Sequence, residues 1–465
     1  MIYIQKNSAE PYYMQIYHQL KEGILSGKIM PNEKLPGIRS LAKTIGVGRN
    51  TVDKAYAQLV VEGYLESRAG SGFLVQHIGT EFLYRQSYPE AEKQQFFKNK
   101  QNQFRYDFQY GGLPLDQFPI KLWKQYTDDA LVSMMAQNNH HHQNTSGDDM
   151  LKRELKTYLY RSRGVVCDEE QIIISCGLPY CIEIICNLLK AQVIVYEEPG
   201  YPGARDIFIK NNAQIALVTA DETGVDLSSL NNLQASAIYV TCSHQFPYGT
   251  VLPIQKRRQL LEWASWRDAF VIEDDYDSEF RYDANPVPSL QAIDKDDRVI
   301  YIGTFSKALS PSMRVNFMVL PKRLLYSYQE RYQGYPCPVS WITQRILANF
   351  IAHGDYERHI RRMTLICKKK HDHFIRIADQ WLGEKIKVYG KGSGLHFFIE
   401  IDDNRKTEEL IGLASKNEVG IYAAESFWYD KSRKKKQVLF LGYANLTEAE
   451  IEEGIIRLYN AWFAV

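Results

Sequence analysis

The stretch Val299–Leu320, VIYIGTFSKALSPSMRVNFMVL, decides the fold. Its apolar runs Val299–Ile302 and Phe317–Leu320 predict two buried strands, and the loop between them carries Lys307. A lysine between two buried strands is unusual, because lysine is almost never fully buried unless it is paired. A desolvated lysine has a lowered pKa and can hold an aldehyde as a Schiff base.

Two hydroxyl side chains and an arginine accompany this lysine. Thr304 and Ser306 precede it, and Arg314 follows it in the same loop. Hydroxyls and a guanidinium suit a phosphate group. An aldehyde that carries a phosphate is pyridoxal 5'-phosphate (PLP), so the loop predicts a PLP site. Taken alone, the loop is better explained as a surface loop with an ordinary solvated lysine, because a short motif is only a hypothesis until its context fits.

Length, charge and cysteine content bound the class of protein. A chain of 465 residues predicts two or three domains. The formal net charge of +1 requires any nucleic-acid surface to be local. The seven cysteines form no CxxC pair and predict reduced thiols. No signal-peptide pattern and no membrane-spanning apolar run is found, so we expect a cytoplasmic protein without a membrane partner.

Residues 104–465 alternate short apolar strands with helical stretches. This order predicts an α/β domain with a mostly parallel sheet, helices on both faces and ligands at the carboxyl ends of its strands. The expected helices include Pro179–Lys190 and Ile254–Asp268. The other expected strands are Ile172–Ser175, Val193–Tyr196, Ile238–Thr241 and Phe270–Glu273.

Further candidate site residues follow the ends of these strands. Asp274 directly follows one strand and could pair with a protonated pyridine nitrogen, and Tyr276 could donate to the phenolic oxygen of PLP. Gly177 and Leu178 link a strand to a helix whose first amides could bind phosphate. An aspartate at this place is more often a turn or N-cap residue.

Two other side chains could reach the ring of the cofactor. Tyr201 lies in a Pro-Gly-Tyr-Pro turn and could stack on the ring, with an ordinary turn aromatic as the alternative. His244 follows another strand and could approach the ring's oxygen, although an isolated histidine there is more often structural.

The first 76 residues have a different pattern. Helices are expected at Tyr12–Ile29, Ser40–Ile45 and Arg49–Glu62, with Gly46 in the turn between the last two. Gly70-Ser71-Gly72 forms the tip of an expected hairpin, or wing. Nine basic and six acidic residues give this segment +3, which agrees with DNA binding. The polar segment 77–103 is expected to be a linker.

This segment of 76 residues, here called the head, resembles the winged helix of GntR-type bacterial transcription factors. The matching residues include Leu35-Pro36, Gly46-Val47, Ala55-Tyr56 and Gly63-Tyr64. The resemblance implies that operator DNA is the partner. The DNA contacts that it implies are Arg39, Arg49, Asn50, Thr51 and Gly72.

The chain from about Tyr106 to the C-terminus resembles fold-type I PLP enzymes of the aspartate aminotransferase superfamily. The segments 244–253, 272–283 and 301–314 are similar to those of MocR-type regulators, which fuse a GntR head to an aminotransferase-like domain. The resemblance implies a smaller C-terminal α+β subdomain at about 335–465. It assigns the Schiff base to Lys307, the ring contacts to Asp274 and Tyr276, and the phosphate to Thr304, Ser306 and Arg314.

Three positions depart from the pattern of the family. Pro179 stands where a glutamine near the phosphate is usual, and His142 lies where many members have a tyrosine. Phe440 replaces the arginine that clamps a substrate α-carboxylate, and Arg205 and Arg281 are possible replacements. We therefore expect the effector to be another amine or PLP itself. We expect no metal at the three adjacent histidines 140–142, because metal sites need fixed ligand geometry.

Two functions fit this sequence. The first is a PLP-dependent transcriptional regulator that forms a homodimer and binds a repeated operator. The second is an active aminotransferase that carries an accessory DNA-binding module. Phe440 and the head favour the first function, while Lys307 and Asp274 keep a half-reaction possible.

Overall fold

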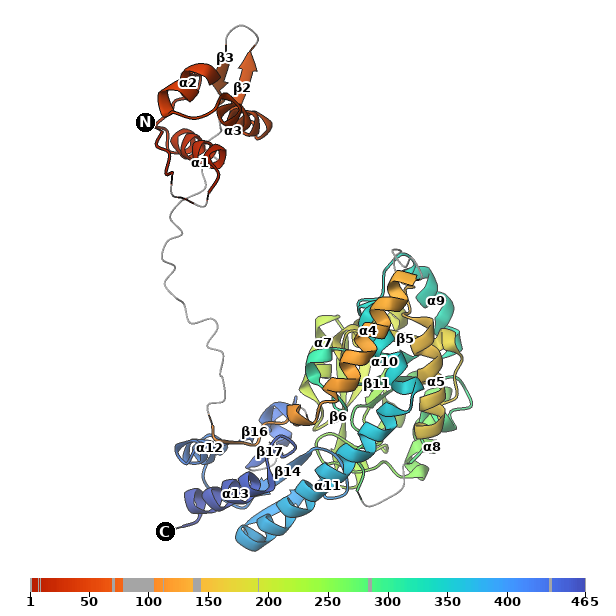
Figure 1. Cartoon of the computed structure of the whole chain (residues 1–465). Helices are drawn as coiled ribbons and strands as arrows, with labels where there is room; N and C mark the ends of the chain where they lie inside the picture. Colours follow the sequence, from red (N-terminus) through yellow and green to blue (C-terminus); the bar gives the residue numbers. More distant parts are fainter. Residues whose placement is uncertain are drawn as a thin grey trace. The chain divides into compact units, whose positions relative to one another are not determined.

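The computed structural model divides the chain into two compact units, Met1–Asn99 and Lys100–Val465 (Figure 1). The wing tip, most of the expected linker and the three adjacent histidines, including His142, lie outside the described residues. The structure describes residues 2–6, 8, 10–68, 72–77, 104–111, 113–136, 144–190, 192–282, 287–434 and 437–464.

The first unit is a winged helix-turn-helix. Its small sheet has the order β1-β3-β2, and both pairings are antiparallel. Gly46, in the left-handed conformation, ends α2 and makes the turn into α3. Ile16, Val52 and Tyr56 are among the buried residues that join the helices. The elements are α1 (Tyr12–Leu25), β1 (Lys34–Leu35), α2 (Ile38–Ile45), α3 (Arg49–Val61), β2 (Leu65–Arg68) and β3 (Gly72–Val75).

The second unit is built on an eight-stranded sheet with the order β5-β12-β11-β10-β9-β6-β7-β8. The pairings among β11, β10, β9, β6 and β7 are parallel, whereas β12 and β8 run antiparallel to their neighbours. The strands are β5 (Ile172–Ser175), β6 (Val193–Glu198), β7 (Gln214–Asp221), β8 (Gly224–Val225), β9 (Ala237–Val240), β10 (Phe270–Asp275), β11 (Val299–Thr304) and β12 (Asn316–Val319).

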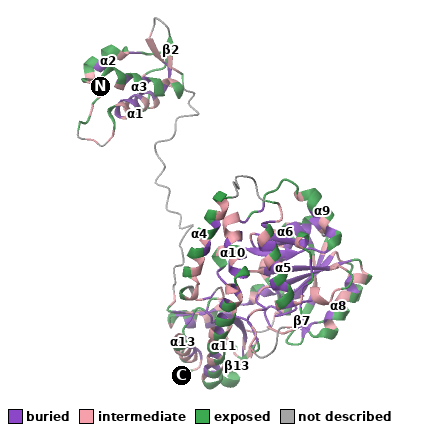
Figure 2. Ribbon diagram, turned by 45° about the vertical axis from the view of Figure 1, so that its right-hand side comes forward, coloured by how far each residue is buried: buried purple, intermediate pink, exposed green. Residues whose placement is uncertain are grey.

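Helices cover both faces of this sheet, and the strands between them are buried (Figure 2). Side chains alternate along each strand, so that Ile172 and Ile174 of β5 join one core and Ile173 joins the other. Helices α6, α7 and α9 pack on the face of Ile173, and α5, α8 and α10 pack on the opposite face. The helices are α4 (Ile120–Ala136), α5 (Asp149–Arg163), α6 (Leu178–Leu189), α7 (Pro202–Lys210), α8 (Ile254–Trp266), α9 (Lys322–Tyr332) and α10 (Trp341–Ala352).

A smaller α+β subdomain follows α10. Its antiparallel sheet has the order β13-β14-β17-β16, and the short strand β15 pairs in parallel with β4, which lies near the start of the unit. In the described part of the chain, no helix is both long and apolar enough to cross a membrane. The elements are β4 (Tyr106–Asp107), α11 (Asp355–Trp381), β13 (Ile386–Tyr389), β14 (His396–Ile401), α12 (Thr407–Lys416), β15 (Val419–Gly420), β16 (Tyr422–Ala423), β17 (Val438–Gly442) and α13 (Glu448–Trp462).

Candidate functional site

A cavity of about 600 Å³ lies where β9, β10 and β11 end. Eight of the ten predicted cofactor residues line it, whereas Gly177 and His244 lie behind the wall. The predicted residues in the wall are Leu178, Tyr201, Asp274, Tyr276, Thr304, Ser306, Lys307 and Arg314. The structure adds Tyr110, Gly111, Pro179, Tyr239, Thr241, Phe246, Pro311 and Asn316.

Lys307 presents its amine to this cavity. The Nζ atom donates a hydrogen bond to the backbone oxygen of Gly111 at 3.2 Å and lies 3.6 Å from the centroid of the Tyr110 ring. Burial lowers the pKa of Lys307 to about 8, although the carboxylates of Asp277 and Asp274 oppose this shift. A neutral amine is therefore accessible near physiological pH, as a nucleophilic lysine requires.

Asp274 is buried near the carboxyl end of β10. The hydroxyl of Tyr239, on the adjacent parallel strand β9, donates a hydrogen bond to its carboxylate. Burial raises the pKa of Asp274 to about 7, while the bond from Tyr239 and the charge of Lys307 lower it. A cationic ring nitrogen beside this carboxylate would stabilise its charged form, which fits the pyridine nitrogen of PLP.

Hydroxyl and cationic groups gather at the other end of the cavity. Thr304 donates to the side-chain oxygen of Asn316 at 3.2 Å and accepts from the backbone amide of Ser306 at 3.1 Å. The Arg314 guanidinium lies against Gly177, so closely that a Cβ on Gly177 would collide with it. Helix α6 begins directly after Gly177, which offers no side-chain cap to its first amides. These groups fit a phosphate.

Tyr276 and His244 form a buried network beside the cavity. The Tyr276 hydroxyl donates to the backbone oxygen of His244 at 3.0 Å and lies 3.0 Å from its Nδ1 atom. The same Nδ1 atom lies 2.9 Å from both carboxylate oxygens of Asp277. His244 therefore positions Tyr276 from behind, and in this structure the Tyr276 hydroxyl points to His244.

His396, at the start of β14, completes a group of three buried potential metal ligands with His244 and Asp277. Burial lowers the pKa of His396 well below its usual value, and the charges of His244 and Lys307 act in the same direction. Asp277 already binds the His244 ring with both oxygens. We therefore interpret the pair of His244 and Asp277 as a hydrogen-bonded support for Tyr276 rather than as a metal site.

No carboxylate clamp is found among the described residues of the wall, where Lys307 and Arg314 are the basic side chains. Phe440 is buried and packs against Phe246, with ring centroids 5.1 Å apart. Arg205, a proposed replacement, contacts Asp206 and the backbone oxygen of Ser426. Neither Arg205 nor Arg281 lines the cavity.

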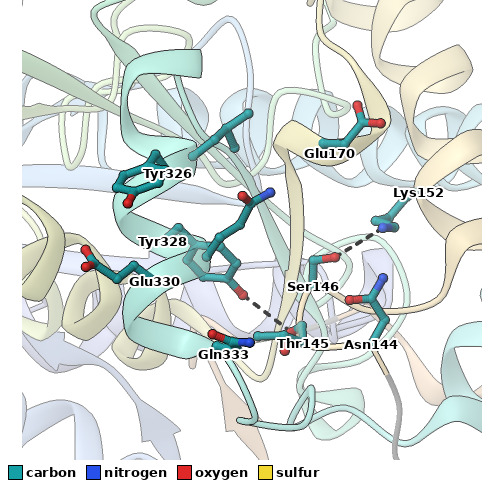
Figure 3. Close-up of a pocket in the computed structure, with 11 residues that line it drawn as sticks. Asn144, Thr145, Ser146, Lys152, Glu170, Tyr326, Tyr328, Glu330 and Gln333 are labelled. Atoms are coloured by element: carbon teal, nitrogen blue, oxygen red, sulfur yellow. Dashed lines mark hydrogen bonds between the residues drawn. The ribbon is translucent and has the colours of Figure 1, made fainter.

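A second hollow of about 590 Å³ lies between α9 and the chain that enters α5 (Figure 3). The Lys152 amine there donates to Ser146 at 3.1 Å and forms an ion pair with Asp149 at 2.9 Å. Tyr328 donates to the backbone oxygen of Thr145 at 3.4 Å. The Lys152 amine in this hollow is therefore already bound by a hydroxyl and a carboxylate.

The predicted DNA contacts lie on the helix-turn-helix and the wing. Arg39 belongs to α2, Arg49, Asn50 and Thr51 form the first turn of α3, and Gly72 begins β3. The first three of these residues are exposed, and Thr51 and Gly72 are half-buried. Gly48 precedes α3 without a side-chain cap, which leaves the first amides of the helix available to a phosphate.

Eight of the lining residues were not predicted as cofactor contacts from the sequence, among them Tyr110, Gly111, Tyr239 and Asn316. Tyr239 could have been found, because it lies on the strand beside β10 and on the side of the sheet that Asp274 faces. Tyr110 and Gly111 carry no motif signal. They approach Lys307 from almost 200 positions away in the chain, so only the fold reveals them.

Comparisons with known proteins agree with both units. A model of bacterial regulatory proteins of the gntR family matches residues 12–75, and a model of aminotransferase class I and II matches residues 107–458. The HTH-type transcriptional regulator YdeL of Bacillus subtilis (strain 168) is 38% identical over 453 residues, which is 97% of each chain.

Two further similarities concern the whole chain and the larger unit. The probable rhizopine catabolism regulatory protein MocR of Rhizobium meliloti is 29% identical over 478 residues, covering 100% of this chain and 96% of that protein. The structure of kynurenine aminotransferase of Pyrococcus horikoshii superposes with a TM-score of 0.68 at 25% identity, covering 77% of this chain and 90% of that one.

Proposed function

Because the chain belongs to the MocR-type subfamily of GntR bacterial transcriptional regulators, we propose that it controls transcription in response to a ligand bound beside Lys307. In this proposal the larger unit binds PLP and the winged helix binds an operator. One observation carries the proposal: Lys307, with its lowered pKa, and the buried Asp274 line the same cavity.

Each group of the wall has a separate task in this proposal. PLP, when bound, supplies an aldehyde that condenses with the Lys307 amine and releases water, and a ring that acts as an electron sink. Asp274 holds the ring nitrogen in its protonated form. Thr304, Ser306, Arg314 and the first amides of α6 hold the phosphate. Tyr201 lines the same cavity, where it would stack on the ring.

The cavity favours an effector other than an ordinary α-amino acid. An α-carboxylate is usually held by a bidentate arginine, and Phe440 occupies that place in β17. The proposed effector is an amine without this requirement, or PLP itself. A substrate that is not clamped is poorly oriented for repeated transamination, so we favour sensing over turnover.

Absorbance spectroscopy tests the cofactor assignment. PLP added to the purified protein should produce the absorption band of a lysine-bound cofactor, and Lys307→Ala should abolish it. A band that persists in Lys307→Ala would exclude Lys307 as the attachment point. Titration with a panel of amines, with DNA binding measured in parallel, then tests the regulatory function. Micromolar saturation by simple α-amino acids would contradict the proposed effector class.

A further inference from the structure

The segment Phe104–Gly111, here called the strap, connects the small subdomain to the site of Lys307. Phe104 is the first described residue after the predicted linker. Strand β4 of the strap pairs with β15, and the backbone amide of Phe108 donates to the oxygen of Gly420 at 2.9 Å. The backbone oxygen of Phe108 accepts from the amide of Gly442 at 2.8 Å.

Close packing adds to these backbone hydrogen bonds. A Cβ on Gly442 would lie 2.6 Å from the Cα atom of Tyr110, and one on Gly454 would lie 2.7 Å from the Phe108 ring. The Tyr422 hydroxyl donates to Asp107 at 2.7 Å. The strap therefore fits against glycine surfaces of the small subdomain and has little room to move relative to it.

The tip of the strap contacts the charged amine of Lys307, and the Tyr110 ring also packs against an apolar cluster that includes Phe246 and Phe440. Gly111 accepts a hydrogen bond from the Lys307 amine, and the face of the Tyr110 ring lies over the same nitrogen. The Tyr110 hydroxyl is buried and has no hydrogen-bond partner in the described structure. The ring, and not the hydroxyl, is thus the part of Tyr110 that interacts with Lys307.

We propose that the strap senses the chemical state of Lys307, with Tyr110 as the residue that positions the amine. The free ammonium donates to Gly111 and forms a cation–π contact with Tyr110. A Lys307 nitrogen that is double-bonded to carbon would keep at most one hydrogen and would turn toward its new partner, which would weaken the hydrogen bond to Gly111 and the contact with the Tyr110 ring. In this proposal Tyr110 and Gly111 are then released from Lys307. The release loosens the strap, whose first residue, Phe104, follows the predicted linker.

This inference rests on the proposed attachment of PLP to Lys307. Whether the free Lys307 amine stabilises the strap can nevertheless be tested without PLP. Hydrogen exchange of peptides covering the strap and β17 reports the bonds of Phe108 and Gly442. We expect exchange about fivefold faster in Lys307→Met than in the wild type, on the order of one lost cation–π contact. Added PLP should accelerate exchange in the wild type to a similar degree.

Substitutions in the strap separate the ring from general packing. Tyr110→Phe keeps the ring and should exchange like the wild type, whereas Tyr110→Leu should resemble Lys307→Met and respond little to PLP. Gln109→Ala changes an exposed strap side chain and serves as the control.

A pH profile shows whether Tyr110 acts through the amine. The groups that act on Lys307 are Asp274 and Asp277 in and after β10, the Tyr110 ring, and His396 at the start of β14. Loss of the ring destabilises the ammonium, so PLP should associate with Tyr110→Leu at lower pH than with the wild type. A profile that does not move would reduce Tyr110 to a packing residue and overturn its positioning role.

Strap exchange that is equal in the wild type, Lys307→Met and Tyr110→Leu would overturn the inference, whether or not PLP binds. The absorbance band, recorded on the same samples, reports the proposed function separately. A normal band with unchanged strap exchange rejects only the strap. An absent band with faster exchange in Lys307→Met supports the hold on the strap and rejects the cofactor assignment.

Discussion

The Tyr239 hydroxyl on β9 donates a hydrogen bond to the Asp274 carboxylate on the adjacent strand β10. The bond is buried, and it lowers the pKa of a carboxyl group that burial raises to about 7. Burial is the larger effect, and the nearby Asp275 and Asp277 carboxylates raise the pKa of Asp274 as well, so the hydrogen bond from Tyr239 offsets only part of the shift. This balance matters because only the ionised form can pair with a protonated pyridine nitrogen.

Tyr239→Phe should weaken PLP binding at neutral pH. Loss of the hydrogen bond raises the pKa of Asp274 further, so more of the carboxyl is protonated at pH 7. A hydrogen bond to a charged group is worth about 1.5–3 kcal/mol, and we expect roughly tenfold weaker binding. Affinity should recover as the pH rises. Absorbance titrations across a pH series measure this, and a uniform loss at every pH would contradict the explanation.

Asp274→Asn should stabilise the PLP-free protein at pH 8. A carboxyl group whose pKa is raised on folding is least favourable above its folded pKa, where the buried group is charged in the native state. Removal of that charge should contribute about 1–3 kcal/mol. The advantage should shrink as the pH falls through 7 toward 4. Thermal midpoints of the PLP-free proteins test this, and the same variant should bind PLP more weakly. A lower midpoint at pH 8 would show that the charge is already well compensated.

Gly177→Ala should weaken the binding of phosphate in particular. Gly177 has a φ of +122°, which disfavours alanine, and the added Cβ would displace the Arg314 guanidinium. We expect roughly tenfold weaker binding of PLP, in the range of one lost charge-assisted hydrogen bond. Pyridoxal, which lacks the phosphate, is the matched ligand and should bind the variant and the wild type alike. An equal loss for both ligands would indicate a general distortion of the cavity.

Patterns in the sequence were sufficient to predict the architecture, but they did not predict all of the residues that line the cavity. The apolar runs that predicted strands 172–175 and 299–302 correspond to β5 and β11, because buried strands of a covered sheet are continuously apolar. Strand β7 was not predicted, although Ile215–Val218 form a short apolar run; its burial is uneven, and both of its end residues are exposed. The turn into α3 was predicted correctly, since Gly46 supplies the required left-handed conformation.

The contacts that sequence could not supply depend on distant chain segments. Asp274 and Thr304 lie at the carboxyl ends of β10 and β11 and Lys307 follows β11, and a parallel sheet brings such residues together whatever their spacing. The strap residues Tyr110 and Gly111 contact Lys307 because the strap packs against the small subdomain. The sequence around Tyr110 and Gly111 contains no pattern that indicates this contact. His244 illustrates a different case: it was predicted beside the ring of the cofactor, but it does not line the cavity, and its partners, Tyr276 and Asp277, are known only from the structure.

Arg49→Ala should weaken binding to the operator. Arg49 is exposed at the first position of α3, where a recognition helix meets base edges. If Arg49 reads a guanine, its loss should cost about 1–3 kcal/mol and relax the preference at that base. Lys28→Ala removes the same charge from an exposed position that follows α1, and it controls for net charge. Fluorescence anisotropy, with a duplex that the wild-type protein selects from random sequence, measures both variants. If the two lose affinity equally and keep the same base preference, Arg49 contributes charge alone and the reading of bases belongs to other residues of the head.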